Sequence, residues 1–497
     1  MKKCAELPDA DLAVNNFEKF IDAGRVREMI YSVLSGSEGA VKSLSSIFGT
    51  SQYLSNILIQ QPELADAILI TENIYQGKTK EMLRDGLAGI LKSADTYESS
   101  LDELCKFKRG EELRIGLRDI LGIAGLRDIM SELSSLADVY IEFSIKLVED
   151  DLVKRYGEPM EITPPFSSPY LRGGLRSGYS KGRGTQAKLG AGDFERSRFA
   201  IIAMGKLGGR ELSFGSDLDI VFAYSNDGET TGSRESGVGS REAKEKISNH
   251  LFFSKLCEKL IYAISGMTRF GFAYRVDTRL RPDGEKGVLV MTLKGYENYY
   301  QKRGEVWERQ ALTKARFIAG DERLGMELIN IIHSFVYDTP FEPAVAKEID
   351  RMRKRIEQER IKSALGRDIK LGRGGIVDIE FIIQFLQLKY GGNFKEIRGT
   401  GSLDTMKFLR EKRLISEKDY QTLSMSYLFL RKIESRIRIE HDRPLSIIPD
   451  SRDELSSLAK KLGYKDNGES AGDKLYKDFE SCTEKVREVY NRIIFNF

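Results

Sequence analysis

The chain has 497 residues, of which 41% are hydrophobic and 31% charged, and its 78 lysines and arginines nearly balance its 75 aspartates and glutamates. This length allows roughly three domains, and the composition is that of a soluble globular protein. A formal net charge of only +3 argues against a surface built for nucleic acid, and no apolar run reaches the roughly 18 residues that a membrane span needs. We therefore expect no nucleic-acid partner and no membrane association.

Cysteine usage indicates a reducing compartment. Cys4, Cys105, Cys257 and Cys482 lie far apart, form no CxxC pair and accompany no histidine at metal-ligand spacing. The pattern predicts reduced thiols in the cytoplasm and argues against a zinc site or a cysteine nucleophile. The first residues contain two lysines but no apolar segment after them, so we expect no signal peptide. The chemistry is therefore expected from carboxylates.

The first part of the chain, residues 1–163, is predicted to be helical. Apolar residues recur at three- and four-residue intervals, and a long final helix is stopped by Gly157 and Pro159. Residues 164–197 change character, since they are rich in Gly, Ser and Arg and lack apolar periodicity. We expect this segment to be a solvated linker, the alternative being that its basic residues contact a phosphate or an acidic partner.

The middle of the chain, residues 198–335, is predicted to be an α/β domain. Short apolar runs predict strands at 198–207, 216–224, 271–280 and 287–293. An amphipathic helix is expected over 245–267, and the domain is expected to end with a helix over 305–320. Alternation of strand and helix patterns is typical of a sheet covered by helices.

The remainder, residues 343–497, returns to a helical pattern. Residues 374–390 begin with a glycine pair and carry Asp378 and Glu380 in the first helical turn, where negative charge favours the helix dipole. Further amphipathic helices follow, and no internal repeat is visible. The predicted fold is thus a small mixed sheet with helices, lying between two helical domains.

The stretch GSDLDIVFAY, residues 215–224, places Asp217 and Asp219 at the start of a predicted strand. Residues two apart on a strand share a face, so the two carboxylates project together. Like charges so close favour a shared cation, and oxygen ligands of this kind suit Mg²⁺ with substrate phosphates. Gly215 lets a phosphate approach the backbone, and Ser216 offers it a hydroxyl and an amide. The alternative is that the two acids solvate a strand end or cap a neighbouring helix.

A third acid lies in the later stretch YRVDTRLRPDG. Asp277 is predicted to lie mid-strand, with Arg279 and Arg281 on the same face. A carboxylate for a metal and two guanidinium groups for phosphate are what nucleotidyl transfer requires. An internal ion pair between Asp277 and Arg279 is the alternative.

Three other basic residues are candidates for phosphate contact. Lys206 follows a strand in GKLGG, which is not a GxxxxGK[ST] loop, and its ammonium would bring a point charge near a triphosphate. Arg309 and Arg316 fall seven residues apart on one stripe of the predicted helix 305–320. That stripe predicts either a phosphate-facing edge or, more ordinarily, a salt-bridged surface helix.

These motifs together resemble a known family. The GSDLD stretch, the distant strand aspartate and the α/β unit are similar to the nucleotidyltransferase superfamily that includes DNA polymerase beta. Four longer stretches resemble the glutamine synthetase adenylyltransferases, as does the helical opening. They are AMGKLGGRELSFGSDLDIVFAY, RVDTRLRPDGEKGVLV, WERQALTKAR and GGIVDIEFIIQ. Members of that family usually carry two nucleotidyltransferase halves, one adding AMP and one removing it by phosphorolysis. This sequence shows one set of motifs, as expected of a single-site version, a separated half or a fragment.

The resemblance implies a polymerase beta-like domain, Mg²⁺, ATP as substrate and a tyrosine of glutamine synthetase as the adenylylated group. It implies that the catalytic and metal-holding residues are Asp217, Asp219 and Asp277, and that the nucleotide is bound by Gly215, Ser216, Lys206, Arg279 and Arg281. It also implies glutamine synthetase as partner and the PII signalling protein as a regulator, in the cytoplasm. The wording is closer to the adding half, and the direction of the reaction stays open.

Two other hypotheses stay open beside this one. The same chemistry could serve another acceptor, such as an RNA end, a small molecule or another protein, although the near-neutral charge speaks against nucleic acid. A catalytically idle module that only binds glutamine synthetase or PII is the second, and the presence of all three acids speaks against it.

Overall fold

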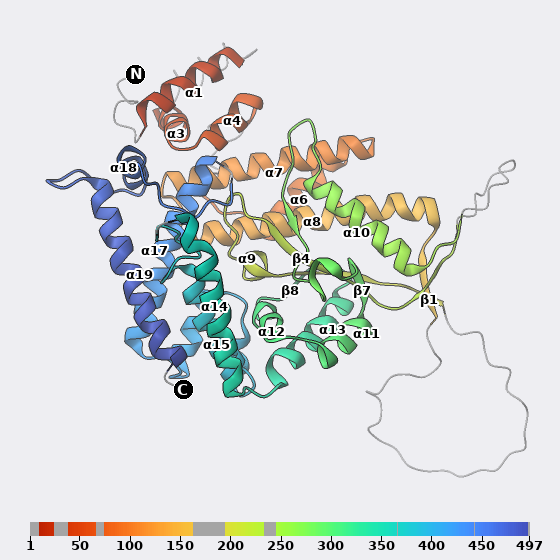
Figure 1. The fold of residues 1–497 in the computed structure, drawn as a ribbon. Helices are drawn as coiled ribbons and strands as arrows, with labels where there is room; N and C mark the ends of the chain where they lie inside the picture. The colour runs from red at the N-terminus through yellow and green to blue at the C-terminus, as the bar shows by residue number, and fades with distance from the viewer. Residues whose placement is uncertain are drawn as a thin grey trace, which may run out of the picture.

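The computed structural model describes residues 9–23, 38–65, 74–162, 194–232, 245–364, 366–441 and 443–495. These residues form a helical N-terminal part, a central part with two small sheets and a helical C-terminal part, in the predicted order (Figure 1). Cys4 and nearly all of the predicted linker 164–197 lie outside the described residues. The limits of the four predicted segments stay predictions.

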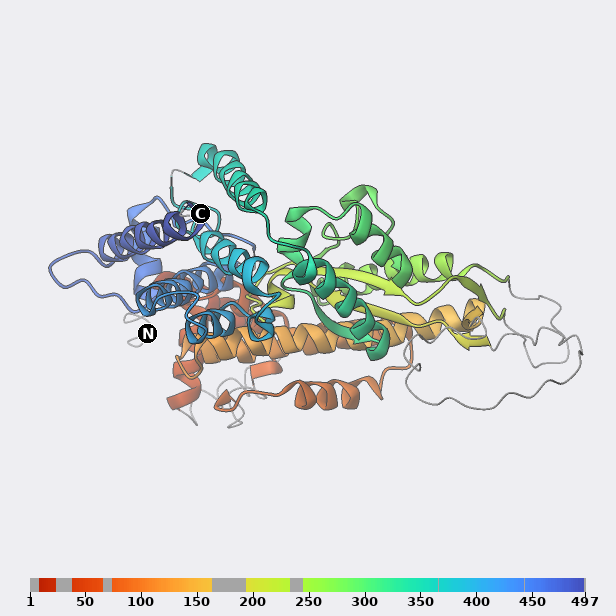
Figure 2. The ribbon, with the colours of Figure 1, turned by 90° about the horizontal axis from the view of Figure 1, so that it is seen from below.

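The N-terminal part is helical, as predicted. Its helices are α1 (Ala10–Ala23), α3 (Glu38–Phe48), α4 (Gln52–Gln60), α6 (Lys80–Leu91), α7 (Tyr97–Ile120) and α8 (Leu126–Tyr156). Helix α7 begins at a capping box, in which Thr96 and Ser99 satisfy each other's backbone N–H groups. Helix α8 ends at Gly157, whose φ of 79° suits glycine and few other residues. Figure 2 shows α8 running as one long rod beneath the central sheet.

The central part holds two sheets. The smaller joins β1 (Pro159–Ile162), β2 (Phe194–Arg196) and β5 (Gly228–Thr230) in the antiparallel order β2-β1-β5. The larger consists of β3 (Phe199–Ala203), β4 (Leu218–Tyr224), β6 (Val276–Asp277), β7 (Val290–Thr292) and β8 (Arg316–Gly320). Its order is β6-β4-β3-β8, and β7 also pairs with β4. Because β4 is antiparallel to β3 but parallel to β6 and β7, this sheet is mixed.

Both faces of the larger sheet are covered, so alternate residues of a strand enter different cores. Ile201 and Phe222 pack in the core shared with α8 and α10, whereas Ile202 and Val221 pack in the core shared with α11 and α13. The helices of the central part are α9 (Gly205–Gly208), α10 (Asn249–Ser265), α11 (Leu293–Lys302), α12 (Val306–Leu312) and α13 (Glu322–His333). Burial on both faces explains why β3 and β4 read as continuous apolar runs.

The structure corrects two of the predicted elements. The strand expected over 271–280 is reduced to the two residues of β6. The helix expected over 305–320 is wrong in its second half, since α12 ends at Leu312 and Arg316–Gly320 is strand β8. Pairing with β3, from Ala203 opposite Arg316 to Ala200 opposite Gly320, is a tertiary contact that a local helical pattern does not reveal. The other predicted strands and the helix over 245–267 are confirmed as β3, β4, β7 and α10.

The C-terminal part is helical, as predicted. Its helices are α14 (Pro343–Ala364), α15 (Ile376–Tyr390), α16 (Ser402–Glu411), α17 (Glu417–His441), α18 (Arg452–Lys461) and α19 (Ala471–Phe495). The π-helical segment η5 (Ser334–Asp338) precedes α14, and the 3₁₀ turn η6 (Lys395–Arg398) joins α15 to α16. A further 3₁₀ turn, η4 (Gly284–Lys286), lies in the central part between β6 and β7. Helix α17 packs against α4 and α8 of the N-terminal part, where the Ser51 hydroxyl donates to the carbonyl of Ile439. The last part of the chain therefore closes back onto the first.

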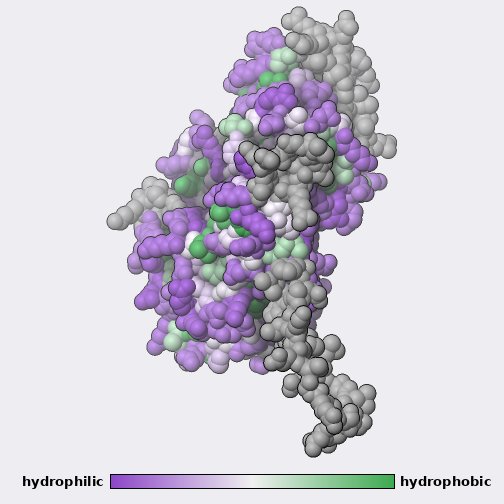
Figure 3. Space-filling model, turned by 90° about the vertical axis from the view of Figure 1, so that its right-hand side faces the viewer, coloured by the Kyte–Doolittle hydropathy of each residue, from purple (hydrophilic) through white to green (hydrophobic). Residues whose placement is uncertain are grey.

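The face of the molecule seen in Figure 3 is largely polar. Figure 3 shows a mostly hydrophilic face on which hydrophobic residues gather only in small, separate patches. Among the described residues, no helix combines the length and the apolar character needed to cross a membrane.

Candidate active site

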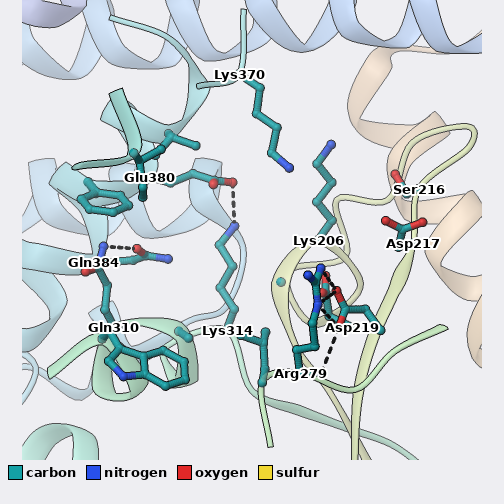
Figure 4. Close-up of a pocket in the computed structure, with 18 of the residues that line it drawn as sticks. Lys206, Ser216, Asp217, Asp219, Arg279, Gln310, Lys314, Lys370, Glu380 and Gln384 are labelled. Atoms are coloured by element: carbon teal, nitrogen blue, oxygen red, sulfur yellow. Dashed lines mark hydrogen bonds and ion pairs between the residues drawn. The ribbon is translucent and has the colours of Figure 1, made fainter. Parts of the chain in front are cut away.

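A pocket of about 440 Å³ lies where the sheet edge at β4 and β6 meets α12, α14, α15 and α17 (Figure 4). Its volume falls within the usual range for small-molecule sites. The polar side is lined by Gly205, Lys206, Ser216, Asp217, Asp219, Asp277, Arg279, Lys314, Lys370, Glu380 and Arg438. The other side is mainly apolar and is lined by Leu280, Trp307, Gln310, Ala311, Met352, Ile356, Val377, Phe381, Gln384 and Pro444. All three predicted acids therefore line one cavity.

Parallel strand pairing brings the three carboxylates together. Asp219 on β4 stands in register with Asp277 on β6, and Asp217 immediately precedes β4. Neighbouring strands lie about 4.8 Å apart, so two acids distant in the sequence become neighbours at one edge of the sheet. The sequence predicts Asp277 as a third acid of the same site, and the pairing of β4 with β6 places it there.

Burial and mutual repulsion perturb these acids. Burial, followed by the charge of Asp277 and more weakly that of Asp217, raises the pKa of Asp219 to about 6. Hydrogen bonds from Arg279 lower the pKa of Asp277, because its Nε lies 2.9 Å from Asp277 Oδ2. Oδ1 of Asp217 is buried and has no hydrogen-bond partner among the residues that the structure describes. An unpartnered carboxylate oxygen beside a second buried carboxylate is a place where a cation is favourable.

The donor set fits a hard divalent cation at Asp217 and Asp219, because both offer oxygen ligands at the open edge of the sheet. Within the described parts of the chain, no three His, Cys, Asp or Glu side chains form a ready-made metal cluster. Asp277 is instead engaged by Arg279, the ion pair named above as the alternative. The predicted three-carboxylate metal site therefore stays a prediction, with Asp217 and Asp219 as its better-supported members.

Gly205 allows the backbone to approach these acids closely. Its φ is 52°, and a Cβ at this position would lie 2.4 Å from Oδ2 of Asp219. The preceding residue, Met204, donates its N–H to the backbone oxygen of Asp219 at 2.8 Å. Glycine at this turn therefore leaves room for the carboxylate where β3 passes into α9.

Lys206 and Ser216 line the pocket and are both tied to α17. Glu434 accepts from Lys206 Nζ at 2.6 Å, from Arg431 at 2.5 Å and from Arg438 at 2.9 Å. Burial would raise the pKa of Glu434, but these three charges hold it well below its ordinary value. Arg438 also donates to Oγ of Ser216 at 3.1 Å. A helix of the C-terminal part thus positions two side chains of the central part.

Two more lysines extend toward the same space as Lys206 (Figure 4). Lys314 donates to Glu211 at 2.7 Å and to Glu380 at 3.2 Å. Burial lowers the pKa of Lys314, but these carboxylates outweigh it and raise the pKa above its ordinary value. Lys370 lines the pocket, and the structure records no ion pair for its ammonium among the described residues. An uncommitted cation opposite a carboxylate pair suits a phosphate group.

Three other residues that were predicted to bind the nucleotide do not lie among the buried groups of the pocket. Arg279 pairs with Asp277 and stays largely exposed at the mouth of the pocket. The prediction that Arg281 shares a strand face with them is wrong, because β6 ends at Asp277. Arg281 instead donates to the carbonyl groups of Thr278 at 2.9 Å and Gly287 at 3.2 Å, which holds its own loop together. Gly215, with a φ of 59°, lines a small neighbouring cavity rather than the main pocket.

Arg309 and Arg316 follow neither of their two interpretations. Arg309 is buried and donates to the carbonyls of Val336 and Thr339. Arg316 lies on β8, not on a helix, and binds Asp138 at 2.7 Å. Neither arginine lines the pocket, and both act as internal connections between elements.

Sequence reasoning did not assign several residues that the fold brings to the pocket. They are Lys314, Lys370, Glu380, Gln384 and Arg438. Lys314 falls within WERQALTKAR, and Glu380 and Gln384 fall within GGIVDIEFIIQ, so the resemblance marked their segments without indicating a role. Their contribution follows from the closure of α15 and α17 over the sheet edge.

Comparison with protein families gives two matches along the chain. The model described as Glutamate-ammonia ligase adenylyltransferase matches residues 41–165 and 179–330. The model described as GlnD PII-uridylyltransferase matches residues 344–494. The first match contains the three aspartates and α12, and the second contains nearly all of α14 together with α15 and α17, which supply further residues of the pocket lining.

Curated relatives are similar over most of this chain. Relatives from Nitrosococcus oceani and Nitrosomonas eutropha are 30% and 32% identical over 86% of it, and one from Burkholderia mallei is 33% identical over 84%. Each is named bifunctional glutamine synthetase adenylyltransferase/adenylyl-removing enzyme. The matched region covers 40% of the first relative and 42% of the other two, so the chain spans well under half of their length.

Proposed function

This chain belongs to the glutamate-ammonia ligase adenylyltransferase family, and on that premise we propose that it moves AMP between a nucleotide and a tyrosine of glutamine synthetase with the help of Mg²⁺. The observation that carries the proposal is one cavity in which Asp217 and Asp219 face Lys206, Lys314 and Lys370. Carboxylates for a cation opposite ammonium groups for phosphates are the minimum equipment for nucleotidyl transfer.

The acidic residues of the pocket would bind the cation, and the basic residues would bind the phosphates. Asp217 and Asp219 would hold Mg²⁺, which would neutralise phosphate charge and make the acceptor hydroxyl more acidic. Lys370 has no recorded ion pair among the described residues and would bind phosphate oxygens, while Glu211 and Glu434 hold Lys314 and Lys206 at fixed positions beside it, where their N–H groups can also donate to phosphate. Arg279 is exposed at the mouth and can reach either Asp277 or the leaving phosphate.

The reaction itself follows from these positions. The tyrosine oxygen loses its proton to solvent water and attacks the α-phosphorus of ATP, an O–P bond forms, and the bond from the α-phosphorus to the bridging oxygen breaks to release pyrophosphate. In the removal of AMP, inorganic phosphate attacks the phosphorus of tyrosyl-AMP, the new O–P bond makes ADP, and the bond from that phosphorus to the tyrosine oxygen breaks, so that the tyrosine leaves and takes up a proton. The lysines stabilise the charge that develops on the phosphate oxygens in either direction.

Fold and partners are proposed on the same footing. The mixed sheet carrying acids on β4 and on its parallel neighbour β6 supports a polymerase beta-like nucleotidyltransferase domain. The match of residues 344–494 to the GlnD PII-uridylyltransferase model supports regulation related to PII. Glutamine synthetase as partner follows from the names of the relatives.

Intact-mass measurement of glutamine synthetase tests the proposal. One tube holds the synthetase, this protein, Mg²⁺ and ATP, and a second holds adenylylated synthetase with Mg²⁺ and inorganic phosphate. We expect a gain of one AMP per subunit in the first tube or its loss, with ADP formed, in the second. Asp219→Asn should reduce either rate by at least about a thousandfold, because it removes a carboxylate from the cation site.

The outcome separates the alternatives. Turnover of ATP without any change in the synthetase would indicate another acceptor. Binding of Mg-ATP with no turnover in either tube would indicate a regulatory module. A folded protein that binds no nucleotide would refute the proposal.

A further inference from the structure

The apolar side of the pocket has no part in the phosphate chemistry proposed above. It is built by Trp307 on α12, Met352 and Ile356 on α14, and Val377 and Phe381 on α15. Among these, Trp307 and Phe381 are only partly buried, so their rings border the cavity rather than the interior of a core. An apolar, partly aromatic wall beside a phosphate site is suited to a flat heteroaromatic group.

We propose that this wall, together with Gln310 and Gln384, is the subsite for the base of the nucleotide and that it prefers adenine. The inference rests on the proposed function, since it assumes that the phosphates lie beside Asp217 and Asp219. Figure 4 shows the two glutamines on the opposite side of the cavity from those aspartates, so a nucleotide would span the pocket.

The two glutamines are hydrogen-bonded to each other, and each keeps one further amide atom that can form a hydrogen bond. Nε2 of Gln310 donates to Oε1 of Gln384 at 2.8 Å, and both side chains are buried, with 4% and 9% of their surface exposed. For the remaining amide atoms, Oε1 of Gln310 and Nε2 of Gln384, no hydrogen bond is recorded among the described residues. One acceptor and one donor therefore stay available at the cavity, the combination that adenine meets with its amino group and a ring nitrogen.

The surroundings favour adenine over guanine. Guanine carries a carbonyl where adenine carries its amino group, and it adds a ring N–H and an amino group at the neighbouring positions, for which the wall of Met352, Ile356 and Val377 offers no side-chain acceptor. A donor buried without an acceptor is unfavourable, whereas adenine presents only a C–H at the corresponding edge. The polar atom of Trp307 is already used, because Nε1 donates to Glu305 at 2.8 Å, so its ring offers an apolar face for stacking.

The first test uses the fluorescence of Trp307, which is the single tryptophan in the sequence. With Mg²⁺ present, the full chain is titrated with ATP, GTP and inorganic tripolyphosphate, and binding is followed in parallel by calorimetry. ATP should change the tryptophan emission as it binds. Tripolyphosphate should bind more weakly and leave the emission unchanged, because it lacks a base.

The second test measures the preference for the base. Gln384→Leu should weaken ATP binding about tenfold, since it leaves a base edge unpaired, and should leave tripolyphosphate binding unchanged. The preference for ATP over GTP should fall by a similar factor. Gln301→Leu, at an exposed position of α11, is the matched control and should bind both ligands as the wild-type chain does. Thermal unfolding of each variant checks that it is folded.

The outcomes distinguish this inference from the proposed function. If ATP binds but the emission stays constant and Gln384→Leu binds ATP normally, the base lies elsewhere and only the inference fails. Equal binding of GTP and ATP by the wild-type chain would overturn the preference for adenine. If neither ATP nor tripolyphosphate binds the folded protein, the proposed function fails, and the inference fails with it.

Discussion

Asp219 lies partly buried beside two other acids, and this position has an energetic consequence. Its pKa is about 6 in the fold against an ordinary value of 3.8, so the folded chain holds the proton more tightly than the unfolded chain does. The stability that this provides is complete below pH 3.8 and is lost as the pH rises through 6. Above pH 6 the ionised carboxylate therefore makes the fold less stable by about 3 kcal/mol.

Replacing this acid should stabilise the protein while it abolishes activity. We expect Asp219→Asn to raise the free energy of unfolding by up to about 3 kcal/mol at pH 8 in EDTA, and by nothing near pH 4. Urea denaturation at a series of pH values measures the difference. Asp85→Asn, on the exposed face of α6, serves as control and should shift stability by less than about 0.5 kcal/mol. Equal stability of Asp219→Asn and wild type at pH 8 would contradict the prediction.

Some of the residues in the pocket could be predicted from the local sequence pattern, and others could not. The sequence could reveal Asp217 and Asp219 because they are two residues apart at the start of one strand, where the two-residue period places both side chains on the same face. Lys370 and Gln384 carry no such signal, since each matters only through what lies opposite it in space. For Arg281 the pattern misled: strand alternation predicted that it shares a face with Asp277, but β6 ends at Asp277 and the strand does not reach Arg281.

Helix α17 is the element that connects the site to the rest of the molecule. Its Glu434 is fully buried and accepts from Lys206, which lies on α9 at the edge of the sheet. A buried carboxylate that keeps its charge needs such partners, and the partners in turn need it. The pair therefore fixes α17 against α9 as well as orienting a lysine toward the pocket.

Neutralising this carboxylate should be strongly destabilising. We expect Glu434→Gln to lower the free energy of unfolding at pH 7 by about 3–5 kcal/mol, because it leaves buried cations without their counter-charge. Glu469→Gln removes an exposed pair with Lys477 and should cost less than about 1 kcal/mol. Urea denaturation of both variants checks this. Similar small losses for the two would mean that α17 is held by its apolar contacts alone.

Strand β8 shows the limit of local patterns at the scale of an element. Its residues RFIAG are apolar enough to extend the periodicity of the preceding helix, and short apolar runs are ambiguous between helix and strand. Pairing with β3 decides for the strand. The elements that were predicted correctly are those with long periodic patterns, such as α8 and α19, or with burial on both faces, such as β4.

At the scale of the whole molecule, the pocket belongs to two parts of the chain. The acids, together with Trp307 and Gln310 on α12, come from the central part, whereas Lys370, Gln384 and the rest of the apolar wall on α14 and α15 come from the C-terminal part. A nucleotide that binds across this pocket must therefore connect them. Helix α17 adds contacts to α4 and α8, so the N-terminal part supports the same junction.

Nucleotide binding should accordingly slow hydrogen exchange on both sides of the pocket. With Mg-ATP at about 100 times its dissociation constant, amides in residues 204–220 and in residues 368–384 should gain protection, up to about 2.7 kcal/mol. Residues 452–461 on α18 lie outside the pocket lining and serve as an internal reference. Asp217→Asn should lose most of the protection in both segments. Protection confined to residues 204–220 would show that the C-terminal part does not contact the nucleotide.

Three features were predictable from the sequence alone: the order of helical, α/β and helical parts, the strand that begins at Asp217 and Asp219, and the resemblance to the adenylyltransferases. These features depend on periodicity and on residues adjacent in the chain, which local physical rules can interpret. The tertiary structure alone decided that Asp277 stands beside Asp219, that Arg281 turns away, and that Lys370 and the glutamine pair face the acids. Such contacts join residues far apart in the sequence, and they arise only when strands pair and helices pack, because no local preference encodes the partner that lies across a pocket.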